Sequence, residues 1–184
     1  MAQAIDDLLE ALEDVDDATR EEASKALAEL ADPSTLDALV VACGDEYWAV
    51  RAHAGRGLSK IGGAKAVEAL IVLFNDSIMD VRNDAVAAMA SMGAVVVDRL
   101  ISALKDERWR VREHAAKTCG DIKDRNVVEP LMLVCRDRDG AVKSAAAEAL
   151  GKIGDPRAIP VLSKLFRDPS KTVRETAGTA LISI

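Results

Sequence analysis

A basic residue recurs along the chain every 30 or 31 residues, and this repeat constrains the fold more than any other sequence feature. Aspartate stands six residues before each basic residue and alanine three residues after it, without exception. A period of this length is typical of stacked supersecondary units, so the chain is predicted to be a repeat protein. The basic positions are Arg20, Arg51, Arg82, Arg112, Lys143 and Arg174.

Two helices are predicted in each repeat. After the basic residue, apolar side chains stand at offsets three, seven and ten, which lie on one face of a helix, helix B. A small residue at offset six lets a neighbouring backbone approach closely. Before the aspartate, a leucine six residues upstream and a large apolar residue or cysteine two residues upstream predict helix A. Each repeat is therefore helix A, a turn that opens at the aspartate, and helix B.

Helix-breaking residues separate the repeats. Asp32-Pro33, Gly62-Gly63 and Gly154-Asp155-Pro156 end one helix B and start the next helix A. Each pair is too short and too one-sided to bury its apolar face alone, so the pairs must stack. We predict an all-α protein, an α-α superhelix of six two-helix repeats with about twelve helices, as a single domain over 1–184. The approximate repeats are 1–32, 33–63, 64–94, 95–125, 126–155 and 156–184.

Charge and hydropathy exclude several classes of protein. No apolar run reaches the roughly 18 to 20 residues of a membrane span, and the N-terminus is acidic, so we expect a cytoplasmic protein without a membrane. Residues 1–32 carry eleven acids against Arg20 and Lys25, and the rest of the chain is nearly neutral. Because no basic stripe follows the repeats, nucleic acid is not the expected partner.

The three cysteines are predicted to belong to the core. Their odd number and irregular spacing do not make a disulfide framework or a metal knuckle. Cys43, Cys119 and Cys135 all fall in apolar columns, where cysteine behaves as a small hydrophobic residue. None of them is placed beside a cation that would activate a thiolate.

The repeat resembles a known family. Residues 142–181 read VKSAAAEALGKIGDPRAIPVLSKLFRDPSKTVRETAGTAL, with aspartate and arginine six apart, and are similar to the HEAT repeat family, above all its phycobilisome-lyase-type repeats of bacteria and archaea. The resemblance covers the whole chain. It implies that B helices line the concave face and that Asp45, Arg51 and their equivalents form a structural hydrogen-bond ladder. Thr19 and Lys143 depart from the pattern. We expect Lys143 to make a weaker contact to its aspartate than arginine would, and we call each such contact between a basic residue and an aspartate a rung of the ladder.

Some members of the family are enzymes, so catalysis has to be considered. In the di-iron deoxyhypusine hydroxylase type, His-Glu dipeptides hold the irons, whereas here His53 and His114 precede Ala54 and Ala115. Two repeats separate these histidines, about 16 to 20 Å for stacked helices, too far for one metal. Bilin lyases lack a short motif to compare. We therefore expect no enzyme, no metal and no cofactor, and we interpret both histidines as exposed or as partner contacts.

The turn before helix B gives the candidate binding site. Three residues before the basic column stand Trp48, Met79 and Trp109 in repeats 2, 3 and 4, and polar residues or glycine elsewhere. Tryptophan and arginine dominate binding hot spots, which favours a docking groove. The alternative is that the tryptophans only cover a neighbouring helix. The predicted partner-binding residues are Tyr47, Trp48, His53, Arg56, Ile78, Met79, Asn83, Ala87, Trp109, Glu113, His114 and Lys117.

These features predict a non-catalytic protein–protein interaction scaffold that binds a protein or peptide on the concave B-helix face of repeats 2–4. The alternatives are an accessory or relative of a HEAT-repeat enzyme of the bilin lyase or di-iron hydroxylase type, and then a nucleic-acid-binding HEAT-like protein. Ile182 is apolar but out of the core register. We expect it to let the last repeat stack on a second copy, on a partner or on a longer array.

Overall fold

The computed structural model describes residues 2–184, and within that range every regular element is helical. Twelve α-helices and four short 3-10 helices follow one another without a strand in this part of the chain. The predicted all-α class and two-helix repeats are confirmed. The chain divides into two compact units, one up to Met92 and one over Gly93–Ile184. Each unit holds three helix pairs, and the single domain over 1–184 stays a prediction.

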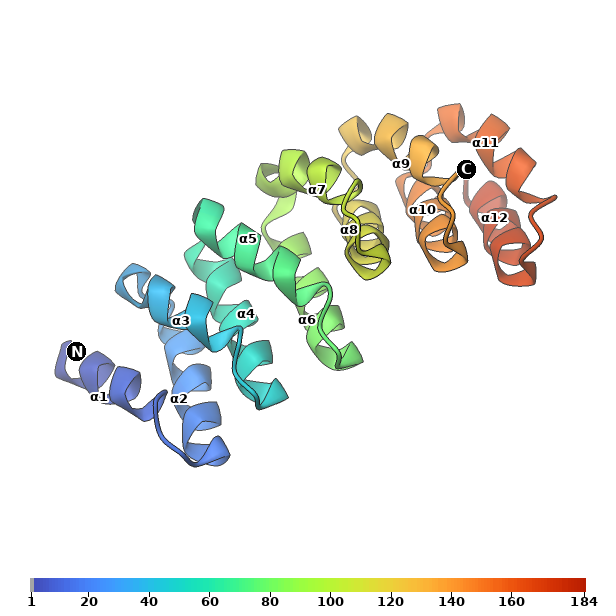
Figure 1. The fold of residues 1–184 in the computed structure, drawn as a ribbon. Helices are drawn as coiled ribbons and strands as arrows, with labels where there is room; N and C mark the ends of the chain where they lie inside the picture. The colour runs from blue at the N-terminus through green and yellow to red at the C-terminus, as the bar shows by residue number, and fades with distance from the viewer. Residues whose placement is uncertain (1) are drawn as a thin grey trace. The chain divides into compact units, whose positions relative to one another are not determined.

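The N-terminal unit contains repeats 1–3. Its A helices α1, α3 and α5 form one layer and its B helices α2, α4 and α6 form a second layer (Figure 1). The elements are α1 (Ala2–Ala11), α2 (Asp17–Leu30), η1 (Pro33–Thr35), α3 (Leu36–Ala42), α4 (Trp48–Ile61), α5 (Gly63–Leu73) and α6 (Met79–Ser91).

The C-terminal unit contains repeats 4–6, again with A helices in one layer and B helices in another (Figure 1). Each of its A helices follows a 3-10 turn. The elements are η2 (Gly93–Val96), α7 (Val97–Ala103), α8 (Trp109–Ile122), η3 (Arg125–Val127), α9 (Val128–Val134), α10 (Gly140–Ile153), η4 (Pro156–Ala158), α11 (Ile159–Leu165) and α12 (Lys171–Ser183).

The core consists of the columns that the spacing predicts. The alanine at offset three is buried in every repeat, and the helix A leucine is fully buried in repeats 2–6. Small residues set the distance between successive B helices. A Cβ atom on Gly57 would lie 2.9 Å from the Ala28 Cα, and one on Gly120 would lie 2.7 Å from the Ala149 Cα. The small residue at offset six therefore faces offset eight of the preceding repeat, a partner column that the sequence analysis missed.

Arginine and aspartate tie successive repeats together within each unit. Arg51 Nε and Nη2 donate to the Asp76 carboxylate at 2.6 and 2.8 Å, and Arg51 Nη1 donates to the Asp45 carbonyl at 2.8 Å. The Asp76 carboxylate also accepts the backbone N–H of Ile78 at 2.8 Å. Asp76 thus stabilises its own turn and holds the arginine of the preceding repeat. The same geometry recurs for Arg20 with Asp45 and for Arg112 with Asp137.

The ladder is weaker where lysine replaces arginine. Lys143 Nζ donates to the Asp168 carboxylate through one contact, whereas Arg112 makes two contacts to Asp137 and two to backbone carbonyls. The loss of the bidentate contact expected at Lys143 is confirmed, and its effect on stability stays a prediction. Arg82 keeps its bonds to the Asp76 and Ser77 carbonyls, but its Nε is buried without a hydrogen-bond partner among residues 2–184.

Lys143 and Arg112 make different numbers of hydrogen bonds, so exchanging lysine and arginine at these two positions tests what the additional bonds contribute to stability. We expect Lys143→Arg to raise the free energy of unfolding by about 1 kcal/mol, since arginine restores the two-pronged contact to Asp168. Arg112→Lys should lower it by about 1 to 2 kcal/mol, because three of the four hydrogen bonds are lost. Urea unfolding followed by circular dichroism measures both changes. Equal stabilities for the two variants would contradict the assigned role of the guanidinium fork.

The ladder also makes stability depend on pH. Burial alone would raise the pKa of Asp137, but the hydrogen bonds from Arg112 and from the Asp139 N–H lower it below its ordinary value. The pKa of Asp76 is lowered in the same way by Arg51 and Ile78. A lowered folded-state pKa stabilises the fold above the unfolded value of about 3.9, and this contribution is lost as the pH falls through the folded value.

We therefore expect the melting temperature to fall steeply as the pH drops below about 4, where these carboxylates take up protons. Asp137→Asn should melt earlier than the wild type at neutral pH and should lose less on acidification, because it has no charge to lose at this rung. Thermal melts between neutral and acid pH measure both slopes. Parallel slopes for the two proteins would show that Asp137 does not carry the acid sensitivity.

Candidate partner-binding surface

The first residues of the B helices divide the repeats into two groups. In repeats 1, 5 and 6 the N-cap residue is Asp16, Asp139 or Ser170, and its side chain accepts a backbone N–H of the following turn. Such a cap satisfies a helix donor that otherwise has no partner. The N-cap side chain in each of these three turns therefore stabilises the start of its B helix.

Repeats 2, 3 and 4 have no such cap. Their N-cap residues Tyr47, Ile78 and Arg108 make no side-chain capping hydrogen bond, although the backbone has the same extended conformation. The next residue in each is Trp48, Met79 or Trp109, which are 41%, 61% and 40% exposed. A capping residue is worth about 1 kcal/mol, so these three repeats lack a local stabilisation that repeats 1, 5 and 6 have, and their B helices begin with a large, partly exposed apolar residue.

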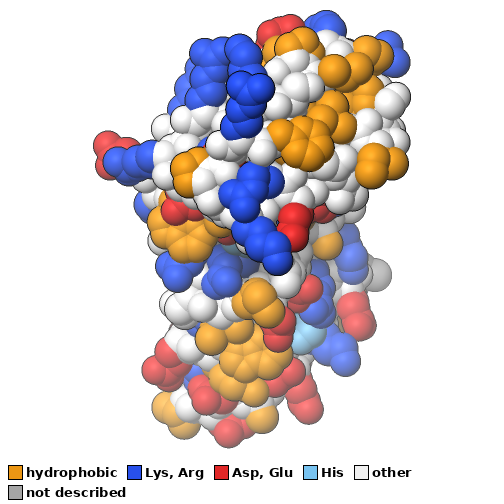
Figure 2. Space-filling model, turned by 90° about the vertical axis from the view of Figure 1, so that its right-hand side faces the viewer, with side chains coloured by type: hydrophobic (Ala, Val, Ile, Leu, Met, Phe, Trp, Pro, Cys, Tyr) orange, Lys and Arg blue, Asp and Glu red, His pale blue; other side chains and the backbone are white. Residues whose placement is uncertain are grey.

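Aromatic contacts organise these side chains. The rings of Tyr47 and Trp48 have centroids 6.2 Å apart and are inclined by 58°. The Arg110 guanidinium lies over the Trp109 ring, with Cζ 5.0 Å from its centroid. Both tryptophans therefore offer partly exposed ring surface beside a polar group, which is the chemistry of an interface anchor. Exposed hydrophobic side chains gather among charged ones on the surface that Figure 2 shows.

The capping difference can be tested by alanine substitution. Asp139→Ala should lower the free energy of unfolding by about 1 kcal/mol, because the carboxylate accepts the N–H groups of Ala141 and Val142 at 2.8 and 3.3 Å. Arg108→Ala at the equivalent position removes only an exposed ion pair with Asp106, so its effect should stay within about 0.5 kcal/mol. Chemical unfolding compares the two. Similar losses would mean that Arg108 acts as a cap.

The B-helix face of the N-terminal unit contains a polar hollow. It has a volume of about 450 Å³ and lies over α2, α4 and α6. His53, Arg56 and Ala87 all line it, so three of the predicted partner-binding residues are brought together. Arg56 Nη2 donates to Asp84 Oδ2 at 2.5 Å. Burial, and then the charge of Arg56, lower the pKa of His53 below its ordinary value.

The B-helix face of the C-terminal unit has a hollow of about 390 Å³, which Glu113 and Lys117 line. Lys117 Nζ donates to Glu113 Oε1 at 2.7 Å. The expectation that His114 is exposed is wrong, since this residue is only 2% exposed. Its Nδ1 donates to the Arg110 carbonyl at 2.7 Å, so the ring lies back along its own helix in the core. Offset two alone did not reveal this difference from His53, which is partly exposed.

Other predicted residues lie apart from these hollows. Ile78 is 39% exposed and Asn83 is also exposed, both in the N-terminal unit, while Trp109 belongs to the C-terminal unit. One groove over repeats 2–4 stays a prediction. Ile182 is 89% exposed and stands at offset eight, the column that faces the next repeat elsewhere. Its role in self-association also stays a prediction.

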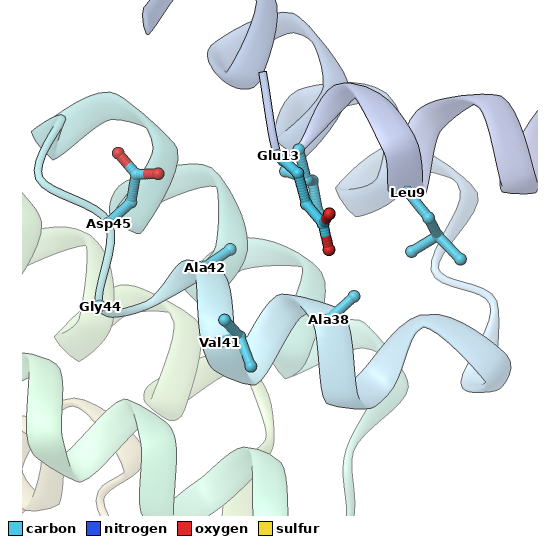
Figure 3. Close-up of a pocket in the computed structure, with 8 residues that line it drawn as sticks. Leu9, Glu13, Ala38, Val41, Ala42, Gly44 and Asp45 are labelled. Atoms are coloured by element: carbon cyan, nitrogen blue, oxygen red, sulfur yellow. The ribbon is translucent and has the colours of Figure 1, made fainter. Parts of the chain in front are cut away.

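An apolar hollow between two A helices was missed by the sequence analysis. It lies between α1 and α3, with a volume of about 450 Å³ (Figure 3). Leu9 of α1 and Glu13, which follows α1, face the side of α3 that carries Ala38 (Figure 3). One signal was available in the sequence, because Val41 is apolar at a helix position outside the core columns, and it is 77% exposed.

The chemistry of the remaining reactive groups is limited. Cys43, Cys119 and Cys135 are free and buried, as predicted, and burial raises the pKa of each thiol to about 12. Within residues 2–184, no three His, Cys, Asp or Glu side chains are grouped to hold a metal ion. No single helix in this range is long and apolar enough to cross a membrane. Only the pair Met79–Ser91 and Gly93–Ala103, which is bent at a break between the two segments, has the length and composition of a membrane span.

Comparison with known proteins places this geometry in context. A family model described as HEAT repeats matches residues 5–90 and 97–182. A search of curated proteins finds no match. An engineered protein shares 24% identity over 98% of this chain and 96% of its own, with a TM-score of 0.54.

Two natural structures are also similar. Human deoxyhypusine hydroxylase in complex with glycerol is 23% identical over 100% of this chain and 74% of its own, with a TM-score of 0.53. The complex of CpcE and CpcF of phycocyanin lyase from Nostoc sp. is 25% identical over 81% of this chain, with a TM-score of 0.57. This chain covers 64% of that lyase chain. These likenesses extend to proteins of different activities, so they show the architecture shared among them.

Proposed function

Because the chain belongs to the HEAT repeat family, we propose that it is a non-catalytic scaffold that binds a partner protein through the starts of its B helices in repeats 2, 3 and 4. The N-terminal unit contributes Trp48 and Met79, and the C-terminal unit contributes Trp109. The hollows on the B-helix faces of the two units are lined by polar and charged residues, which supply hydrogen-bonding groups. A repeat solenoid offers extended binding surfaces of this kind.

The observation that carries the proposal is the loss of helix caps in these three repeats and in no other described repeat. Repeats 1, 5 and 6 show that the same turn accepts Asp or Ser with a capping hydrogen bond. A sequence that departs from the stable local choice at consecutive repeats, and exposes large apolar side chains there, has the pattern of a functional surface.

The neighbouring polar groups suit recognition of a polypeptide. In the N-terminal unit the hollow lined by His53, Arg56 and Asp84 offers both donors and an acceptor. These groups lie on helices α4 and α6, and the Arg56–Asp84 ion pair is partly exposed. A peptide backbone or a charged side chain can exchange hydrogen bonds with such groups at the rim, while Trp48 and Met79 bury apolar area.

The enzymatic alternatives have less support from the residues. His53 and His114 lack the glutamate that follows each histidine in the hydroxylase pattern, and the His114 ring is buried against its own helix. For the lyases there is no short motif against which these residues can be compared. We therefore keep to one proposed function, and its cytoplasmic location stays a prediction.

Capture from the lysate of the source organism tests the proposal. The wild type should retain a partner that the double variant Trp48→Ala/Trp109→Ala loses, with an affinity for the isolated partner at least about tenfold lower, because both aromatic anchors are removed. Mass spectrometry identifies the partner and isothermal titration calorimetry measures the affinity. Met79→Ala should weaken binding by a smaller factor, because methionine offers a smaller apolar surface than tryptophan.

The control is Lys171→Ala, which changes an exposed residue in the same column of repeat 6. It should bind like the wild type. Thermal melting of every variant separates binding from packing. If Trp48→Ala/Trp109→Ala melts much earlier and still captures the partner, the tryptophans serve the fold and the proposed surface is wrong.

A further inference from the structure

We infer that the hollow between α1 and α3 is a second docking site, which takes an apolar side chain from a basic amphipathic segment of a partner protein. The site lies on the A-helix side of the N-terminal unit and shares no residue with the surface proposed above. The inference is therefore independent of the proposed function.

The walls of the hollow are apolar and come from two repeats. Leu9 and Leu12 belong to the first repeat, and Ala38, Val41 and Ala42 belong to α3. The small side chains of the alanines leave open a volume of about 450 Å³ (Figure 3). Val41 is 77% exposed at its edge, so an incoming apolar side chain would bury surface that now contacts water.

The rim of the hollow is acidic. The Glu13 carboxylate points toward α3 and has no ion-pair partner among residues 2–184 (Figure 3). Asp45, the other acid, is already held by Arg20 at 2.8 Å, so Glu13 is the charge available to a ligand. Across residues 1–46 the sequence has fourteen acids against Arg20 and Lys25. A cation at the rim is therefore favoured over an anion.

Helix ends add to this preference. Four of the lining residues, Leu12, Glu13, Gly44 and Asp45, follow the last turns of α1 and α3. Neither helix has a basic residue in its last turn. The carbonyl groups at the end of a helix carry partial negative charge, which attracts lysine or arginine from a ligand.

The C-terminal unit contains a matched hollow with the opposite charge. Its eight lining residues occupy the same positions relative to the turn aspartates as those of the first hollow, and it has a volume of about 230 Å³. Lys105 stands where the first hollow has Glu13, and Arg136 stands where it has Gly44. Leu133 is the equivalent of Val41 and is 65% exposed. The two hollows therefore share an apolar shape and differ in charge, so a basic segment should select the first.

The probe is a labelled amphipathic helical peptide of leucine and lysine, about 14 residues long, with leucines on one face. One control peptide keeps the lysines and has serine for leucine, and another keeps the leucines and has glutamate for lysine. Fluorescence anisotropy with the whole chain measures each affinity. We expect the leucine–lysine peptide to bind at least about tenfold more tightly than either control.

Substitutions then locate the site. Val41→Lys and Glu13→Lys should each weaken binding of the leucine–lysine peptide at least about tenfold, because they add positive charge at the hollow. Leu133→Lys makes the matched change in the other hollow and should leave the affinity unchanged, as should Trp48→Ala on the B-helix face. All four positions are exposed, and circular dichroism verifies that the variants fold alike.

Three results would overturn the inference. The first is equal binding of the serine peptide, which would show attraction by charge without the apolar hollow. The second is the same loss in Leu133→Lys as in Val41→Lys. The third is self-association of the wild type in sedimentation velocity that Val41→Lys abolishes, since the occupant would then be a second copy of the chain.

Discussion

The turn aspartate is the group on which the repeat depends, because it makes three kinds of contact at once. Its carboxylate accepts a backbone N–H two residues ahead, its carbonyl accepts the arginine of its own repeat, and its carboxylate binds the arginine of the preceding repeat, as at Asp76. A partly buried carboxylate needs several donors to offset its desolvation, and the turn and the ladder supply them together. Local turn geometry and stacking are therefore specified by the same residue.

This coupling explains why so much of the fold can be predicted from spacing. Offsets from the basic column indicated the alanine layer, the helix A leucines and the buried cysteines, because a helix converts linear spacing into a face. The packing of Gly57 against the residue at offset eight of the preceding repeat was missed by the sequence analysis. The small size of that residue matters only where two helix backbones approach closely, and the distance between the backbones depends on both helices. Spacing therefore predicts the helix face on which a residue lies, but not how deeply its side chain is buried.

In the candidate sites, too, some features could be predicted from the spacing of the residues and others could not. The partly exposed turn tryptophans could be predicted, because their column could be read from the repeat. The prediction named His53 and Arg56 but put the groove over repeats 2–4, whereas the hollow that they line lies over α2, α4 and α6. The burial of His114 could not, because His53 occupies the same column and is partly exposed, so the column does not determine whether the ring is buried. The hollow beside Val41 depends on the gap that small alanines leave between two A helices, and a column of exposed apolar residues only hints at it.

The hydrogen-bond ladder has a direction. Every complete rung runs from a basic residue to the aspartate 25 positions later, so each repeat offers a donor to its successor and an acceptor to its predecessor, as Arg51 and Asp45 do. A gene segment copied in tandem with the period of the repeat would inherit both halves, and the new boundary would close its rung without any further mutation. A chain built this way can lengthen by duplication while each intermediate remains a bonded array, which is a route by which sequences of this regularity arise.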